Sequence, residues 1–229
     1  MSTLVVVEHE SDCPIGRFED WLPGLDVLTV RPYAGENVPS SVDGGLLVLG
    51  GSMSAHDDEV APWLPATRDL LAASAAAGVP TLGICLGAQL LATACAGTVE
   101  VDAAPGRESG VVDVHWRSEA AADPLVAGLP EPFPGPSMHA DAVVRLPTGA
   151  TWLGETGMYP YQAFRVGAAA WGVQFHPEVT LATFRSWAEG HPEVDTEAVT
   201  AELRARDTEV DAAGHALARR FAGLVAGRA

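Results

Sequence analysis

Short apolar runs alternate with helical segments along the first part of the chain. Thr3–Val7 and Gly45–Leu49 are β-rich apolar runs bounded by polar residues or glycine, and Arg17–Leu22 between them has the spacing of a helical turn. Pro65–Ala77 is rich in alanine and leucine and leads into a further apolar run, Val79–Ile84. This alternation predicts an open, mostly parallel α/β sheet with helices on both faces.

The second half of the chain offers several short strands separated by turn residues, which we expect to form a meander on the flank of the sheet. They are Val111–His115, Ala142–Leu146, Thr151–Glu155, Ala163–Val166 and Ala169–Phe175. Pro130–Pro136 holds four prolines and is predicted to be a rigid surface loop. Asp195 can cap a helix that begins near Thr196, and Val210–Ala226 has the pattern of a last amphipathic helix. We therefore expect a main domain over residues 1–190 and a helical C-terminal extension over residues 191–229, packed on the same domain.

Cys85 lies at the most informative turn of the chain. It belongs to the segment Gly83–Gln89, which links an apolar strand to a helix predicted over Leu86–Ala96. A side chain at such a sharp strand-to-helix turn is presented above the sheet edge, and the N–H groups of the first helical turn point at the same place. Because a helix N-terminus favours the thiolate form, Cys85 is predicted to be a nucleophile.

A histidine and a carboxylate follow at the end of another apolar strand, in the segment Trp171–Glu178. In an extended segment residues 176 and 178 project to the same side, which places the carboxylate of Glu178 behind the imidazole of His176. Pro177 stiffens this geometry because its ring fixes φ. A buried thiol and a structural histidine would be the preferred interpretation of either residue alone, but the joint context favours a catalytic triad.

Several blocks of the sequence resemble class I (triad-type) glutamine amidotransferases, and within that class the free-standing proteins similar to the glutaminase domain of GMP synthase. The blocks are Gly50–Asp58, Pro80–Gln89, His139–Asp141, Gln162–Phe164 and Gly172–Val179, in the order of the family. The resemblance implies a flavodoxin-like fold in which the cysteine attacks the δ-carbon of glutamine. The histidine would then protonate the departing ammonia, and the carboxylate would orient the histidine.

The resemblance also implies roles for residues around the nucleophile. The N–H groups of Gly51 and Leu86 would form the oxyanion hole that stabilises the tetrahedral intermediate. Gln89, one helical turn past the cysteine, would hold the α-amino or α-carboxylate group of the substrate. His139 and Asp141 match a His-x-Asp of the family and would line the γ-glutamyl pocket, although a role as hydrogen-bonding loop residues is the alternative.

Two further polar groups follow predicted strands. His56, Asp57 and Asp58 come after the oxyanion glycines and could shape the mouth of the pocket. His9 and Glu10 end the first strand and could reach the same cleft, although a solvated pair is the preferred interpretation.

Composition and charge exclude several classes of function. The 229 residues fit one domain, and the apolar fraction of 48% supports a substantial core. Thirty acidic against thirteen basic residues give a net charge of −17, which repels phosphate backbones and anionic lipids, so we expect no binding of nucleic acid or membranes. The chain shows no membrane-spanning apolar stretch and no basic region of a signal peptide, which predicts a cytoplasmic protein.

Cysteine and histidine usage points away from metals and disulfides. The three cysteines lack CxxC spacing, which suggests a reducing compartment with Cys13 and Cys95 as inert thiols. The histidines are scattered, and neither common phosphate-binding glycine pattern occurs, so we expect no metal, no cofactor and no nucleotide site.

Three functions remain open from the sequence. The first is a hydrolase or transferase that cleaves glutamine or a γ-glutamyl amide through a γ-glutamyl thioester and releases ammonia or an amine. The second is a glutaminase subunit that passes ammonia to a separate ATP-dependent synthetase, because 229 residues leave no room for a synthetase domain. The third is an inactive regulatory or binding module. The sequence does not identify the natural substrate, the ammonia acceptor or the oligomeric state.

Overall fold

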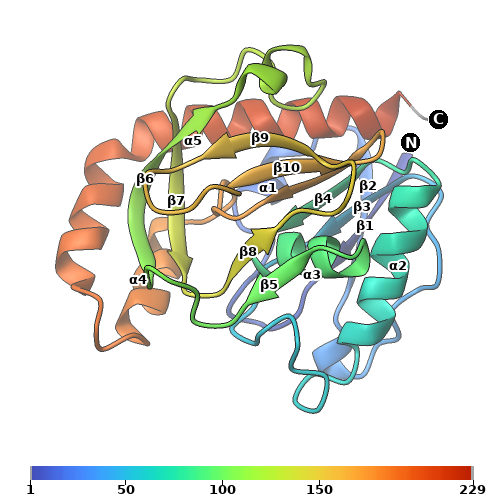
Figure 1. The fold of residues 1–229 in the computed structure, drawn as a ribbon, viewed down its shortest axis with the longest axis horizontal. Coiled ribbons are helices and arrows are strands. Elements are labelled where there is room, and N and C mark those ends of the chain that lie inside the picture. The colour runs from blue at the N-terminus through green and yellow to red at the C-terminus, as the bar shows by residue number, and fades with distance from the viewer. Residues whose placement is uncertain (1, 228–229) are drawn as a thin grey trace.

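A computed structural model describes residues 2–227 and contains one large sheet with helices on both faces (Figure 1). Within these residues the sheet has the strand order β2-β1-β3-β4-β11-β10-β9-β6-β7. Its parallel strands are β1 (Ser2–Val7), β2 (Leu25–Val30), β3 (Gly45–Val48), β4 (Thr81–Ile84) and β11 (Ala170–Val173). The open α/β sheet predicted from the alternation of apolar runs is confirmed.

Antiparallel strands extend the sheet beyond β11, as the predicted meander requires. They are β10 (Ala163–Val166), β9 (Thr151–Glu155), β6 (Glu108–Trp116) and β7 (Phe133–His139). One expected strand departs from the meander: β8 (Ala142–Arg145) pairs instead with β5 (Thr98–Glu100) in a separate two-stranded sheet.

The proline-rich segment that was predicted to be a surface loop contributes a buried strand. Every residue of β7 is buried, and Pro134 and Pro136 lie opposite Asp113 and Val111 of β6. Proline is tolerated there because β7 is the edge strand and needs no N–H donors on its outer side. On that outer side the carbonyl of Pro136 accepts a hydrogen bond of 2.7 Å from the backbone N–H of His176. The strand that sequence analysis missed therefore fixes part of the candidate site.

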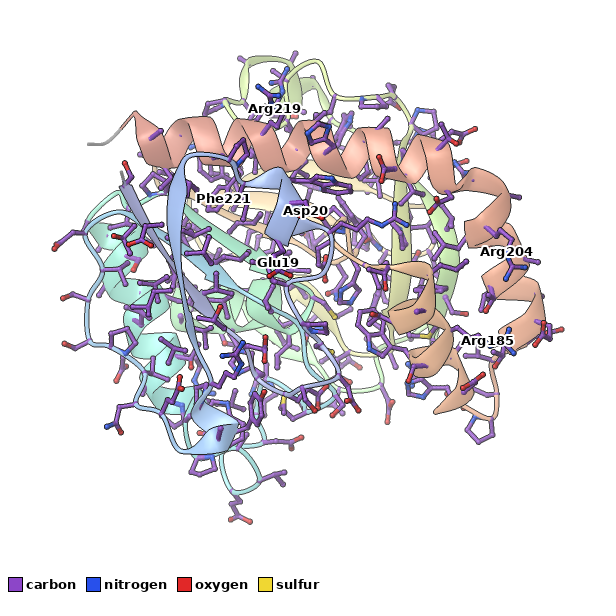
Figure 2. All side chains as sticks on the ribbon, turned by 180° about the vertical axis from the view of Figure 1, so that it is seen from behind. Glu19, Asp20, Arg185, Arg204, Arg219 and Phe221 are labelled. Carbon is purple, nitrogen blue, oxygen red and sulfur yellow. The ribbon has the colours of Figure 1, made fainter. Side chains whose placement is uncertain are left out.

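Helices cover both faces of the sheet. They are α1 (Phe18–Trp21), α2 (Leu64–Ala76), α3 (Leu86–Ala94), α4 (Leu181–Glu189) and α5 (Thr196–Ala226), with 3₁₀ turns η1 (Pro32–Ala34) and η2 (Ser118–Ala122). The cap predicted at the start of α5 forms, because the side chain of Asp195 accepts a hydrogen bond of 3.0 Å from Ala198 N. The expected last helix, Val210–Ala226, is the second half of α5, which crosses the face of the sheet that is turned toward the viewer in Figure 2.

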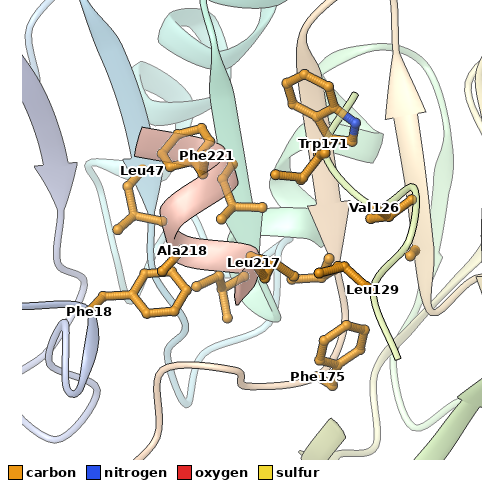
Figure 3. Packing of buried hydrophobic residues seen from close by; sticks show 14 of the residues in the cluster. Phe18, Leu47, Val126, Leu129, Trp171, Phe175, Leu217, Ala218 and Phe221 are labelled. Carbon is orange, nitrogen blue, oxygen red and sulfur yellow. The ribbon is translucent and has the colours of Figure 1, made fainter. Parts of the chain in front are cut away.

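The central strands bury alternate residues on opposite faces, which explains why their sequences are continuously apolar. Val5 and Val7 of β1 belong to the core under α2 and α3, whereas Leu4 and Val6 belong to the core under α5. Figure 3 shows the second of these cores, with Leu217, Ala218 and Phe221 of α5 packed near Leu47 and Phe18.

No helix in the described part of the chain combines the length and the apolar character that crossing a membrane requires.

Candidate active site

The carboxyl ends of four parallel strands meet at one edge of the sheet, and the candidate residues follow these ends. Val173 at the end of β11 lies opposite Ile84 at the end of β4. The next residue after β4 is Cys85, whose backbone N–H donates to the carbonyl of Val173 at 2.8 Å. Gly50 and Gly51 come shortly after β3, the strand that lies between β1 and β4 in the sheet. Residues that are far apart in the sequence are thus assembled by strand order.

The backbone at Cys85 has the strained geometry of a nucleophile elbow. Its φ of 51° and ψ of −106° lie in a region that residues with side chains rarely adopt. Helix α3 starts at the next residue, and Gln89 N closes the first turn with a bond of 3.0 Å to the carbonyl of Cys85. The cysteine is 7% exposed, so its side chain is held in a defined place above the sheet edge.

His176 and Glu178 form a buried pair beside this cysteine. The imidazole Nδ1 lies 2.8 Å from Oε1 of Glu178, and both side chains are 4% exposed. A Cβ atom added to Gly50 would lie 2.9 Å from Cε1 of His176 and 3.7 Å from Cβ of Cys85. The imidazole and the cysteine therefore approach each other across Gly50, and a larger residue at that position would collide with the imidazole. The structure brings the three predicted triad residues together.

The charges around His176 favour its protonated form. Burial lowers the pKa of His176, but the charges of Glu178 and Cys85, together with hydrogen bonds to both, raise it to about 10. Oε2 of Glu178 is buried and has no hydrogen-bond partner within residues 2–227, so this carboxylate depends on the imidazolium for compensation. At neutral pH the arrangement therefore supports an imidazolium beside Cys85.

Trp187 of α4 forms a wall of the site that sequence analysis missed. Its ring centroid lies 4.6 Å from that of His176, at an interplanar angle of 56°. Its indole Nε1 donates to the backbone carbonyl of Asp12 at 2.7 Å, which ties α4 to the loop after β1. The helix itself was not predicted, so no sequence signal placed this tryptophan near the cysteine.

Cys13 lies in the same loop and borders the site. Its thiol donates to Oε1 of Glu10 at 3.2 Å. Burial and the adjacent carboxylate raise the pKa of Cys13, which favours the neutral thiol and agrees with the expectation of an inert cysteine.

The residues predicted to form the oxyanion hole adjoin each other. A Cβ atom on Gly51 would lie 2.9 Å from Cδ2 of Leu86 and 2.6 Å from Sδ of Met53, so a larger residue would force these two side chains to shift. Gly51 and Cys85 line the same cavities. The role of these two N–H groups as donors stays a prediction.

A cavity of about 300 Å³ opens on one side of the cysteine, and three residues predicted to bind the substrate line it. Nε2 of Gln89 donates to the backbone carbonyl of Asp141 at 2.9 Å and to Oε1 of Gln174 at 3.3 Å. Nε2 of Gln174 in turn lies 3.5 Å from Sγ of Cys85. Since both N–H groups of Gln89 have protein acceptors, its Oε1 is the atom that can meet a donor group of a substrate.

His139 reaches the wall of this cavity from β7 and is held at both ring nitrogens. Nδ1 lies 2.9 Å from the carbonyl of Asp141, and Nε2 lies 3.1 Å from Oε2 of the buried Glu108. Burial raises the pKa of Glu108, but hydrogen bonds from His139, Thr156 and Gln162 lower it below its usual value. Glu108 is therefore the carboxylate that positions the ring of His139. No spacing in the sequence predicted this role.

Of the three polar candidates after the oxyanion glycines, only one lines the cavity. Asp57 lines the same cavity. His56 instead bonds the carbonyl of Val99 through Nε2 at 3.2 Å, and Asp58 pairs with Arg68 at 2.7 Å.

The interpretation of His9 and Glu10 as a solvated pair was wrong. His9 is fully buried, and its Nδ1 accepts a hydrogen bond of 3.0 Å from the indole of Trp63. The carboxylate of Glu10 accepts from both the N–H and the hydroxyl of Ser52 at 2.7 Å. The first strand ends inside the molecule, so these residues fix the loops around the site.

Acid should destabilise the protein through His9, and His9→Gln should remove that part of the effect. Burial lowers the folded-state pKa of His9 from 6.5 to about 4. Below pH 6.5 His9 binds a proton in the unfolded chain but not in the folded chain. The contribution of neutral His9 to the unfolding free energy is therefore fully present above pH 6.5 and is lost as the pH falls toward 4. Between about pH 7.5 and about pH 5, the wild type is expected to lose about 2 kcal/mol more unfolding free energy than the variant. Urea unfolding at both pH values measures this, and equal losses would contradict it.

Comparisons with known proteins agree with this geometry. A family model described as "Glutamine amidotransferase class-I" matches residues 27–187. The glutamine-hydrolyzing GMP synthase of Thermosipho africanus is 36% identical over 150 residues, which are 65% of this chain and 27% of that protein. One separate subunit of the glutamine-hydrolyzing GMP synthase of Halobacterium salinarum is 33% identical over 159 residues, which are 69% of this chain and 79% of that subunit.

A solved structure of a glutamine amidotransferase from Methylobacillus flagellatus superposes with a TM-score of 0.83 at 26% identity, covering 100% of this chain and 95% of that one. The chain thus spans about a quarter of the length of the GMP synthase from Thermosipho africanus and most of the length of the separate subunit from Halobacterium salinarum.

Proposed function

The chain belongs to the class I glutamine amidotransferase family, and we propose that it hydrolyses glutamine or a γ-glutamyl amide through a γ-glutamyl thioester on Cys85. One observation carries the proposal: Cys85, with its strained backbone at the strand-to-helix turn, lies beside the imidazole of His176, which is hydrogen-bonded to the buried carboxylate of Glu178. An amide is a poor electrophile, and this set supplies the nucleophile and the proton carrier that its cleavage needs.

The reaction proceeds in two steps, formation of the thioester and its hydrolysis. The thiolate of Cys85 attacks the δ-carbon, and the N–H groups of Gly51 and Leu86 stabilise the oxyanion that forms. The C–N bond then breaks as the imidazolium of His176 gives its proton to the leaving nitrogen. In the second step water attacks the thioester while the neutral imidazole takes its proton, the C–S bond breaks, and glutamate and the thiolate are released.

The cavity that contains Gln89 binds the glutamyl part of the substrate. Its lining includes one guanidinium among the described residues, that of Arg107, which is paired with Glu193 at 2.7 Å. Arg107 suits the α-carboxylate of the substrate because a guanidinium binds a carboxylate through two parallel hydrogen bonds. Oε1 of Gln89 and the carboxylate of Asp57, which line the same cavity, suit the α-ammonium group.

A second candidate function is that of a glutaminase subunit which passes ammonia to a separate ATP-dependent synthetase. It is favoured by the similarity to the separate GMP synthase subunit from Halobacterium salinarum over most of that subunit's length. In this case the triad chemistry is the same, but the rate depends on a partner that orders the oxyanion glycines.

The purified chain tests the proposal directly, without ATP, metal or partner. Glutamate release from glutamine and from γ-glutamyl amides is measured, then repeated with a candidate synthetase added. We expect release from the chain alone. If every compound stays intact until the synthetase is present, the subunit function replaces the free hydrolase.

A glutamine-like chloroketone is expected to label Cys85 and to spare Cys13 and Cys95. Only Cys85 combines a helix N-terminus with an imidazolium, whereas burial raises the pKa of the other two thiols. Peptide mass spectrometry after partial labelling gives the distribution, and glutamine should slow the reaction. Equal labelling of the three cysteines would show that the elbow does not activate its thiol.

A further inference from the structure

A second cavity meets Cys85 on the side away from Gln89, and we propose that it binds the leaving amine of the substrate. The preferred substrate is then a γ-glutamyl amide of an organic amine that carries a second positive charge, rather than glutamine. This inference rests on the proposed function and names its substrate class.

The lining residues show which cavity faces which part of the substrate. Cys85 and Gly51 line both cavities. Gln89 and Asp141 line only the first cavity, whereas His176 lines only the second. Because His176 gives its proton to the departing nitrogen, that nitrogen and whatever it carries leave toward the second cavity.

The second cavity is far larger than ammonia requires. It measures about 280 Å³, whereas a molecule of the size of water or ammonia occupies about 30 Å³. The cavity on the glutamyl side, at about 300 Å³, has nearly the same size. The site therefore has room for two organic groups, one on each side of the scissile bond.

The walls of the second cavity suit an alkylammonium group. Trp187 offers an aromatic face, and Asp12 at the exposed end adds a carboxylate. No lysine or arginine is among the described residues that line this cavity. Burial and the charge of Arg107 lower the pKa of His191, so this lining residue adds no positive charge at neutral pH. An amine whose far end is cationic would place that end between Trp187 and Asp12.

The chemistry of the step is unchanged by the larger leaving group. The C–N bond breaks as the amine nitrogen receives the proton of His176, and the free amine departs through the open end of the cavity. Water then hydrolyses the thioester, so the products are glutamate and the amine, and no further reactant is needed.

Three substrates with one glutamyl group test the proposal: glutamine, γ-glutamyl butylamide and the γ-glutamyl monoamide of 1,4-diaminobutane. Release of glutamate gives kcat/KM for each. We expect the neutral butylamide to exceed glutamine, and the cationic amide to exceed the butylamide by about tenfold.

Two variants assign the effect to the cavity. Asp12→Asn should lower the preference for the cationic over the neutral amide by about fivefold. Asp20→Asn, on α1 (Figure 2), removes the same charge at a residue that does not line the cavity and should keep the preference. Ser186→Trp, at an exposed lining residue of α4, should lower kcat/KM of the butylamide at least about tenfold more than that of glutamine.

The outcomes separate this inference from the proposed function. Cleavage of glutamine with no cleavage of either organic amide would overturn the inference and leave the proposed function in place. Equal effects of Ser186→Trp on all three substrates, or of Asp12→Asn on both amides, would also overturn it. No glutamate from any of the three compounds, with or without a synthetase, would contradict the proposed function and the inference together.

Discussion

Replacing Cys85 with alanine is expected to lower the turnover of glutamine or a γ-glutamyl amide by at least about 10⁴-fold, because no thioester can form. The fold should persist, since the side chain is small, 7% exposed and replaced by a smaller apolar one. Steady-state glutamate release measures the rate, and circular dichroism with thermal unfolding checks the fold.

Cys95→Ala is the matched control, because Cys95 caps the far end of α3. It should keep the wild-type rate. A folded Cys85→Ala protein with as much as about a tenth of the wild-type rate would remove this cysteine from the mechanism.

Replacing His176 with alanine is expected to lower kcat by about 10³-fold or more, with a smaller change in KM. The variant loses both the cation that stabilises the thiolate and the proton donor for the leaving nitrogen. Because these residues act as a unit, a Cys85→Ala/His176→Ala double variant should be no slower than Cys85→Ala. His115→Ala, at an exposed histidine of β6, is the control and should keep the rate.

The His176→Ala change also leaves the carboxylate of Glu178 buried without its partner, which costs about 3–5 kcal/mol. If the single variant unfolds, His176→Ala/Glu178→Gln removes that charge and keeps the test open. Glu178→Gln alone should be milder than His176→Ala, because the Cys85–His176 pair retains both of its members. A His176 variant with unchanged kcat would contradict the proposed proton transfer.

Local sequence signals were sufficient for the elbow and for the histidine–carboxylate pair. Cys85 follows an apolar strand and precedes a helix, and both elements form where the pattern predicts them. His176 and Glu178 are two residues apart, and the predicted contact between them forms. The extended geometry predicted for this segment was wrong, because residues 177 and 178 form a turn in which Val179 N donates to the carbonyl of His176 at 3.4 Å. Parallel strands then bring these two segments together, because a parallel sheet aligns the carboxyl ends of its strands.

Contacts between distant segments could not be predicted in this way. The first half of β7 belongs to the segment Pro130–Pro136, whose four prolines are typical of a loop, and only its place at the sheet edge makes it a strand. Glu108 supports His139 across β6 and β7, a pairing without a fixed spacing. Trp187 and Asp12 meet only because α4 folds back over the loop after β1. The cavity proposed for the leaving amine depends on the last of these contacts, because Asp12 and Trp187 both line it.

Partitioning with hydroxylamine tests the thioester at Cys85 most directly. Every substrate gives the same γ-glutamyl thioester once its leaving group has departed, and this intermediate reacts with either water or hydroxylamine. The ratio of γ-glutamyl hydroxamate to glutamate should therefore be the same for glutamine and for an organic γ-glutamyl amide at each hydroxylamine concentration. The ratio should rise in proportion to hydroxylamine, and Cys85→Ala should give neither product. A ratio that differs between the two substrates, or glutamate formed with no hydroxamate, would contradict the account.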